Sequence, residues 1–291
     1  MTDSREYELD KQRVRAGFSR AAASYDKHAV VQREVQNRML ERLDWILMQP
    51  ERVIDLGCGV GDALDALSRR YRGARVVGLD FAREMAMRAR QRGRWLRRPQ
   101  VVCGDMELLP LADACFDMAI SSAALQWCDS LDRTFAEVRR ILAPGGLWMF
   151  TTFGPDTLRE LRAAFAAVDG GAGVHVNIFT DMHDVGDALV RAGFADPVMD
   201  QETLTLTYPD LTHLIRDLRG VGVRNALAGR GSGLFGPRRL VAVAEAYARE
   251  FGVEGRLPAT WEVVYGHAWV PDAPPPGGPP PERLIPIKPA P

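Results

Sequence analysis

Between residues 52 and 152, short apolar runs alternate with longer amphipathic segments, and this alternation restricts the fold more than any other feature of the chain. Val53-Ile54 and Val76-Val77 are apolar throughout, as strands are when helices cover both faces of a sheet. The expected strands are 52–56, 75–80, 101–104, 116–121 and 147–152, and the expected helices are 62–71, 82–92 and 131–142. This pattern predicts an α/β fold with a doubly wound, mostly parallel sheet of the Rossmann-like type.

The segments on either side of this core are expected to be mainly helical. Val31, Val35, Met39, Leu43 and Leu47 recur at every fourth residue, which predicts one amphipathic helix that ends before Pro50. Beyond residue 153 we expect helices at 156–168 and 180–192, a strand at 204–208, a helical insertion at 210–252 and a last strand at 261–270. We expect the extra helical pieces to form a lid over the carboxyl ends of the strands, where open α/β sheets bind ligands.

These expectations divide the chain into four parts. Residues 1–50 form an N-terminal helical segment or lid, 51–153 the cofactor-binding core, and 154–270 the rest of the sheet with helical lid insertions. Residues 271–291 contain ten prolines and are expected to be a disordered tail.

The composition excludes several classes of function. The 37 basic and 38 acidic residues nearly cancel, so no overall field would attract nucleic acid or an anionic membrane. No segment approaches the roughly 18 apolar residues of a membrane span. The four cysteines and five histidines show no metal-ligand spacing, and no metal is expected. We therefore expect a cytoplasmic protein, most simply a monomer, that binds neither nucleic acid nor a membrane.

The segment from Asp55 to Gly61 closes the first strand and opens a helix. Its glycines, Gly57, Gly59 and Gly61, alternate along the loop, which lets the backbone turn sharply and approach a ligand closely. The spacing is G-x-G-x-G, not the dinucleotide pattern G-x-G-x-x-G, and Asp62 is a poor neighbour for a diphosphate. The loop thus favours a cationic or zwitterionic ligand and disfavours a nicotinamide-dependent dehydrogenase.

Two acidic residues end the next strands. Asp80 can accept both ribose hydroxyls of an adenosine, although it can also cap the following helix. Asp105 can meet the adenine amino group or simply make a turn, and Phe81 and Met106 can sandwich the ring. The order and spacing of these residues favour the adenosine-binding interpretation over the structural alternatives.

These residues resemble the motif series of class I S-adenosylmethionine-dependent methyltransferases. The matching positions are Asp55 to Gly61, Asp80, Gly104-Asp105, Phe116-Asp117 and Leu142 to Gly146. The resemblance implies the fold of that class and S-adenosylmethionine as the cofactor, but it does not identify the acceptor.

A second resemblance extends over most of the chain, to Trp269. It lies in Val14 to Asp26, Leu125 to Cys128, Phe150 to Leu158 and Leu218 to Asn225, and it is to the malonyl-acyl-carrier-protein O-methyltransferases of biotin synthesis. That family implies methylation of the free malonyl carboxylate, on acyl-carrier protein or on coenzyme A. The region 153–261 also resembles mitochondrial complex I assembly factors associated with arginine hydroxylation, so a cofactor-binding factor that acts on a protein partner is the alternative.

The resemblance also suggests residues for the acceptor. A carboxylate is already ionised at neutral pH, so its methylation needs no general base. An arginine fork can bind it, and Arg219 and Arg224 lie in the lid segment that resembles the family. Tyr25 can close over the substrate, and Gln126-Trp127 follows the fourth strand at the expected mouth of the site. The arginine-rich run 88–98 can receive an acidic carrier protein or can be an ordinary solvated helix face.

Overall fold

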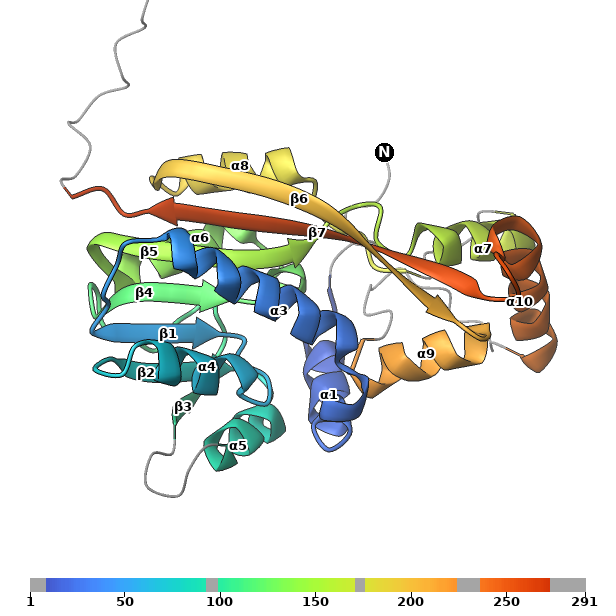
Figure 1. Ribbon diagram of the computed structural model, residues 1–291, viewed down its shortest axis with the longest axis horizontal. Helices are drawn as coiled ribbons and strands as arrows, with labels where there is room; N and C mark the ends of the chain where they lie inside the picture. Colours follow the sequence, from blue (N-terminus) through green and yellow to red (C-terminus); the bar gives the residue numbers. More distant parts are fainter. Residues whose placement is uncertain (1–8, 93–98, 171–175, 224–235, 273–291) are drawn as a thin grey trace, which may run out of the picture.

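The computed structural model describes residues 9–92, 99–170, 176–223 and 236–272, and these form a seven-stranded sheet flanked by helices (Figure 1). The strand order is β3-β2-β1-β4-β5-β7-β6. The first five strands in the sequence are parallel, and β7 lies antiparallel between β5 and β6. The strands are β1 (Arg52–Leu56), β2 (Arg75–Asp80), β3 (Gln100–Cys103), β4 (Phe116–Ser121), β5 (Leu142–Phe153), β6 (Ala195–Tyr208) and β7 (Leu257–Trp269). The predicted doubly wound, mostly parallel sheet is confirmed.

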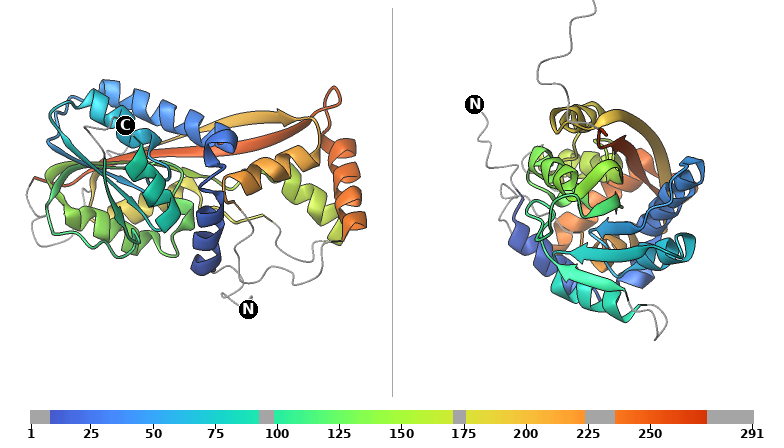
Figure 2. Two further views of the ribbon diagram at one scale, coloured as in Figure 1. Left: turned by 90° about the horizontal axis from the view of Figure 1, so that it is seen from below. Right: turned by 90° about the vertical axis from the view of Figure 1, so that its left-hand side faces the viewer.

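Helices cover both faces of the sheet, as the uniformly apolar strands require (Figure 2). Successive side chains of a strand point to opposite faces. Val53 therefore packs in one core with α3 (Val30–Arg42) and α4 (Asp62–Arg70), where α5 (Arg83–Gln91) also contributes. Ile54 packs in a second core with α6 (Leu131–Ile141) and α8 (Met182–Arg191).

The remaining helices lie beyond the carboxyl ends of the parallel strands (Figure 1). They are α1 (Lys11–Ala21), α2 (Tyr25–His28), α7 (Arg159–Asp169), α9 (Leu211–Gly220) and α10 (Pro237–Phe251). The long antiparallel pair of β6 and β7 extends past the other strands. Helices α7 and α10 pack against β7, and α9 packs against β6. The helix expected at 180–192 corresponds to α8 and does not lie over the carboxyl ends of the strands. It packs on α6 and β6 at the face of the sheet.

The N-terminal helix is shorter than its apolar repeat predicts. Helix α3 ends at Arg42, a 3₁₀ turn follows at Leu43–Trp45, and Ile46 is already extended. Leu47 is fully exposed. The prediction that Leu47 continues the buried face was therefore wrong, because the chain leaves the helix to enter β1.

Two strands are longer than predicted. β6 begins at Ala195, nine residues before the predicted start at Leu204, and its first half is mostly exposed because it forms the edge of the sheet. β5 begins at Leu142 and already contains Pro144-Gly145-Gly146. These residues form an irregularity, because Phe116 is in register with Leu142 whereas Met118 pairs with Leu147.

The described helices include none that is both long enough and apolar enough to cross a membrane. The predicted tail falls almost entirely in residues 273–291, outside the described residues.

Candidate functional site

A cavity lies where the loops after β1, β2, β3 and β4 meet the N-terminal helices. The core loops supply most of the lining, and α1 and α2 add Lys11, Phe18 and Tyr25. The lining residues are Lys11, Phe18, Tyr25, Gly57, Gly59, Leu79, Asp80, Phe81, Met85, Gly104, Asp105, Met106, Ser122, Ala123, Ala124, Trp127 and Cys128. The structure thus brings Gly57, Gly59, Asp80, Phe81, Asp105, Met106, Tyr25 and Trp127 together, as the sequence predicts.

The glycine loop is held by β2 and cannot accept side chains at its first turn. The amides of Gly57 and Cys58 both donate to the carbonyl of Leu79, at 2.7 and 2.9 Å. Gly57 has a φ of 78°, and a Cβ there would lie 2.4 Å from the Cβ of Ala124. Gly61 caps α4 with a φ of 90° and faces Ala89, so it shapes the loop without lining the cavity.

Asp80 connects the glycine loop to the start of α5. One carboxylate oxygen accepts from the amide of Gly59 at 2.9 Å and the other from the amide of Ala82 at 2.8 Å. The side chain also lines the cavity, so the two interpretations of Asp80, helix cap and ligand contact, are compatible. Burial raises its pKa to about 7, although these two backbone hydrogen bonds favour the charged form.

Asp55 lies in an adjoining polar cavity that shares Tyr25, Gly57 and Gly59 with the first. Its side chain is 2% exposed and forms no hydrogen bond with another described residue. Burial, followed by the charges of Asp80 and Asp62, raises its pKa to about 8. Such an uncompensated carboxylate favours a cation, since an opposite charge would stabilise its ionised form.

The same polar cavity contains a positive group. Arg33 of α3, whose guanidinium also donates to the carbonyl of Asp26, lines it together with Gln32 and Gln36. The cavity therefore presents a carboxylate and a guanidinium, the two charges that a zwitterionic amino acid requires.

Aromatic side chains from distant parts of the sequence form one wall of the larger cavity. Phe18 of α1 packs edge-on against Phe81, with ring centroids 6.0 Å apart, and against Trp127, at 5.4 Å. Met106 is also buried there. Phe18 was not predicted as a site residue. It lies in the N-terminal segment that resembles the family, and that resemblance was the only available indication.

Lys11 is the second residue that the sequence analysis missed. Its ammonium contacts Asp105 at 2.7 Å and also Glu107. Burial opposes its charge, but the hydrogen bonds to Asp105 and Glu107 prevail and raise the pKa of Lys11. Helix α1 is thereby fastened to the loop after β3, beside the proposed adenine contact.

Helix α2 is fastened to α5 in a similar way. Asp26 accepts from Arg88 at 3.1 Å and from Arg92 at 2.7 Å. Next to it, burial and then the charges of Asp80 and Asp62 raise the pKa of Tyr25 well above its usual value. Tyr25 is therefore a neutral phenol at physiological pH, able to donate a hydrogen bond but not to act as a base.

Three predicted residues lie elsewhere. Gln126 is turned away from the cofactor cavity, since its amide donates to the carbonyl of Ala123 at 2.7 Å and accepts from Thr152 at 3.4 Å. Arg219 is exposed on α9 and lines none of the described cavities. Arg224 lies outside the described residues. The side chain of Arg219 thus lies outside the cavity that Tyr25 and Trp127 line.

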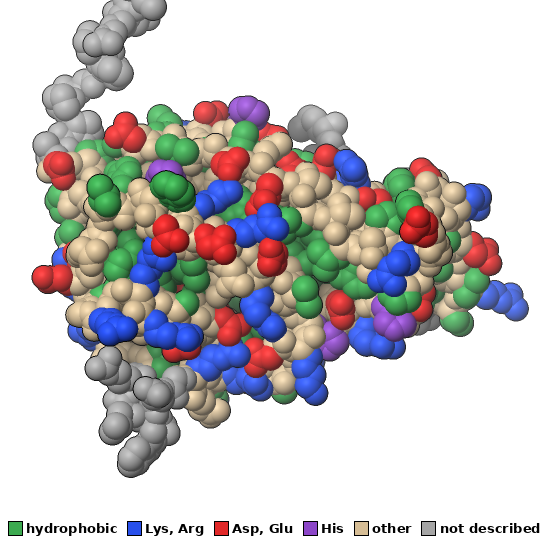
Figure 3. Space-filling view, in the orientation of Figure 1, with side chains coloured by type: hydrophobic (Ala, Val, Ile, Leu, Met, Phe, Trp, Pro, Cys, Tyr) green, Lys and Arg blue, Asp and Glu red, His purple; other side chains and the backbone are tan. Residues whose placement is uncertain are grey.

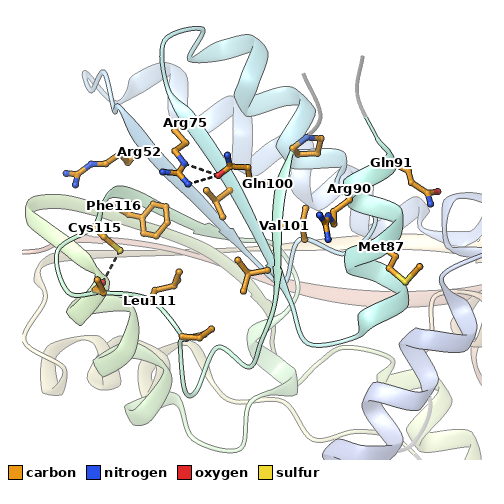
Figure 4. Close-up of a pocket in the computed structure, with 15 residues that line it drawn as sticks. Arg52, Arg75, Met87, Arg90, Gln91, Gln100, Val101, Leu111, Cys115 and Phe116 are labelled. Atoms are coloured by element: carbon orange, nitrogen blue, oxygen red, sulfur yellow. Dashed lines mark hydrogen bonds between the residues drawn. The ribbon is translucent and has the colours of Figure 1, made fainter. Parts of the chain in front are cut away.

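A larger open groove lies at the other end of the sheet (Figure 4). Between β3 and β4 the described chain contains no helix, and the apolar residues Val77, Val101 and Phe116 line the groove there. Arg52 and Arg75 on its rim are bound to Asp117 and Gln100. Both arginines lie at the amino ends of their strands, so this groove is separate from the cavity that the glycine loop lines.

Comparison with known proteins decides the family. Residues 54–150 match the model of the methyltransferase domain. The chain is 53% identical over 274 residues to the malonyl-acyl-carrier-protein O-methyltransferase of Laribacter hongkongensis, covering 91% of each chain. The chain belongs to this family. The enzyme of the same name from Gallionella capsiferriformans is 49% identical over 91% of this chain and 93% of its own. Like the family, this chain is an S-adenosylmethionine-dependent methyltransferase.

Solved structures support the fold independently. The YcgJ protein of Bacillus subtilis superposes with a TM-score of 0.56 at 15% identity, over 83% of this chain and all of its own. At that identity the likeness concerns the fold alone.

Two segments that carry the family resemblance, 14–26 and 218–225, meet where α1 and α2 pack against the end of α9. Gly17 packs so closely on Gly222 that a Cβ would lie 2.8 Å from its carbonyl oxygen. The hydroxyl of Ser24 donates to the carbonyl of Gly220 at 3.3 Å, and a Cβ on Gly220 would clash with the ring of His28. The two distant segments are therefore the two sides of one tight contact, which closes α1 and α2 against α9.

Proposed function

We propose that this methyltransferase acts on the free carboxylate of a malonyl thioester carried by acyl-carrier protein and produces its methyl ester for biotin synthesis. The observation that supports this most is the extent of the similarity to the named relatives. The 53% identity covers 91% of the chain, so it includes the lid helices over the cavity as well as the cofactor-binding core.

The described residues suit S-adenosylmethionine in both halves of the site. We propose that the methionine part lies in the polar cavity, with its ammonium at Asp55 and its carboxylate at Arg33. The adenosine part would occupy the larger cavity, with the ribose at Asp80 and the adenine between Phe81 and Met106, beside Asp105. When bound there, the cofactor supplies a methyl group on a positively charged sulfur.

The chain's own contribution to transfer is positioning and exclusion of water. The methyl group of the bound cofactor would pass to an oxygen of the malonyl carboxylate, leaving the neutral thioether, and no residue would have to remove a proton. Opposite charges disappear in this step, so a dry cavity favours it. Phe18 and Trp127 would keep water from one side of the cavity. The neutral Tyr25, which lines both cavities, would donate a hydrogen bond to the acceptor carboxylate or to the methionine carboxylate.

The expected resemblance of region 153–261 to complex I assembly factors includes residues with a structural role in this fold. Thr157 and Glu262 join the start of α7 to β7, since the hydroxyl of Thr157 donates to the Glu262 carbonyl at 3.1 Å. The Glu262 carboxylate accepts from the amide of Asp156 at 2.7 Å. These contacts anchor the segment before α7 to β7. Their role is structural, so they do not favour hydroxylation.

The test is a methyl-transfer assay with malonyl-carrier, acetyl-carrier and succinyl-carrier side by side. We expect rapid transfer to malonyl-carrier, none to acetyl-carrier, which lacks the carboxylate, and slow transfer to the longer succinyl group. A protein that binds S-adenosylmethionine but methylates none of the three would exclude the proposal and favour the assembly-factor alternative.

A further inference from the structure

Helices α1, α2 and α9 form the most basic surface among the described helices. Together they carry seven Lys and Arg residues and two Asp residues, a net charge of +5 with histidine neutral. Most of this charge lies on α1, at +4, with +1 on α9 and none on α2. Each of the other described helices carries +2 or less, and the whole chain has a formal net charge of −1. Positive charge is thus concentrated on the elements that close the cofactor cavity.

Both acidic residues of this surface already have partners. Asp26 is bound by Arg88 of α5 and by Arg92, which directly follows that helix, and Asp217 by His28 at 2.8 Å. The free positive charges therefore remain uncompensated. Five exposed side chains form no salt bridge within the described part of the chain: Arg15, Arg20, Lys27, Arg216 and Arg219. Figure 3 shows part of this surface, where basic and histidine side chains lie over α1, α2 and α9.

We propose that this basic surface is the docking site for the acidic carrier protein that delivers the malonyl group. The inference rests on the proposed function and extends it from the acceptor's chemistry to its carrier. The surface lies directly over the cavity, since Lys11, Phe18 and Tyr25 project from the same helices into it. A carrier bound there would present its prosthetic arm at the closest approach to the cofactor.

The location differs from the one that the sequence suggested. In the run 88–98, Arg88 and Arg92 are engaged by Asp26, and Arg90 is exposed at the groove of Figure 4, away from the cofactor cavity. Arg94, Arg97 and Arg98 lie outside the described residues. The exposed Arg219 also gains a role here. It attracts the carrier from the surface and does not grip the malonyl carboxylate inside the cavity.

The test uses the double charge reversal Lys27→Glu with Arg216→Glu, because these residues flank the His28–Asp217 pair on neighbouring helices. We expect the KM for malonyl-carrier to rise about tenfold at low salt with little change in kcat, as for charges at the rim of an interface. The defect should shrink toward 1 M salt, where the Debye length falls to about 3 Å. Constants for malonyl-pantetheine, which has no carrier, should not change.

The matched control reverses two exposed arginines away from this surface, Arg72→Glu with Arg249→Glu, neither of which forms a salt bridge with a described residue. It should leave all substrates unaffected. Should the Glu pair fail to fold, Lys27→Gln with Arg216→Gln should give a smaller defect of the same kind.

Direct binding of malonyl-carrier, measured by fluorescence anisotropy, separates this proposal from the proposed function because it needs no turnover. Salt-sensitive binding that the reversal weakens supports the surface even if methyl transfer is absent. The proposal would be overturned if the double variant lost activity equally on malonyl-carrier and malonyl-pantetheine, or if it bound malonyl-carrier as tightly as the unmodified protein.

Discussion

Replacing Asp55 by asparagine should stabilise the cofactor-free protein and weaken cofactor binding at the same time. The Asp55 side chain is 2% exposed, and burial together with Asp80 and Asp62 raises its pKa from 3.8 to about 8. Because the folded-state pKa lies above the unfolded one, the folded protein binds a proton that the unfolded chain releases. The stability that this group contributes is therefore present below about pH 4 and is lost as the pH rises toward 8.

The size of the effect follows from the pKa shift. One pKa unit corresponds to 1.36 kcal/mol, so the shift of about four units sets an upper limit of roughly 5 kcal/mol. Part of the shift comes from the charge of the neighbouring Asp80, so the effect should be smaller than this limit. We expect the free energy of unfolding of Asp55→Asn to exceed that of the unmodified protein by about 2 kcal/mol at pH 8. That gain corresponds to a melting temperature higher by about 4 to 8 °C for a chain of this size, and it should diminish toward pH 4.

Cofactor binding should change in the opposite direction. A neutral amide cannot form the charge-assisted contact with an ammonium, which is worth about 1.5 to 3 kcal/mol, so affinity should fall about 10- to 150-fold. In the unmodified protein, a bound cation lowers the pKa of Asp55, so affinity should rise with pH up to about 8. Titration calorimetry at pH 7 in buffers of different ionisation enthalpy should detect the released proton.

Asp117→Asn provides the matched control. Burial acts against the charge of this carboxylate, but hydrogen bonds from Arg52 prevail and lower the pKa of Asp117. Its neutralisation should reduce the melting temperature and leave cofactor affinity unchanged. The reasoning about Asp55 would be refuted if Asp55→Asn were less stable than the unmodified protein at pH 8 and bound the cofactor equally well.

Three further substitutions test the rest of the cofactor site. Asp80→Ala should weaken S-adenosylmethionine binding by on the order of 2 to 4 kcal/mol in calorimetry, and an effect on thermal stability alone would make Asp80 only a cap. Gly59→Val places a branched side chain at a φ of 53° facing the cavity, so the folded variant should lose affinity, and unchanged affinity would remove the loop from the site. Lys11→Met frees α1 from Asp105 and should speed cofactor dissociation in stopped-flow fluorescence, whereas an unchanged rate would show that α1 does not retain the ligand.

The core fold and the cofactor loop were predictable because their determinants are local. A strand is indicated by its own apolar run, as in β1, β2 and β4, and the turn after β1 by its own glycines, from Gly57 to Gly61. The predicted positions of these elements agree with the structure. Asp80 was predictable for the same reason, since a strand end fixes where its side chain lies.

The lid was less predictable because its contacts join distant segments. Phe18 enters the site only because Gly17 packs against Gly222, more than two hundred residues later in the chain. Nothing local marks Lys11 as the partner of Asp105. Arg219 was named as a site residue because it lies in a segment that resembles the family. The sequence could not show that its side chain is exposed on α9.

The most direct test of the central claim is mass spectrometry of malonyl-carrier after incubation with methyl-deuterated S-adenosylmethionine. We expect one labelled methyl group on the malonyl unit, released as labelled methanol by mild alkali, because an ester at the free carboxylate is hydrolysed under those conditions. Label that resists alkali, or that appears on the carrier polypeptide and not on its acyl group, would contradict carboxyl methylation as the activity of this protein.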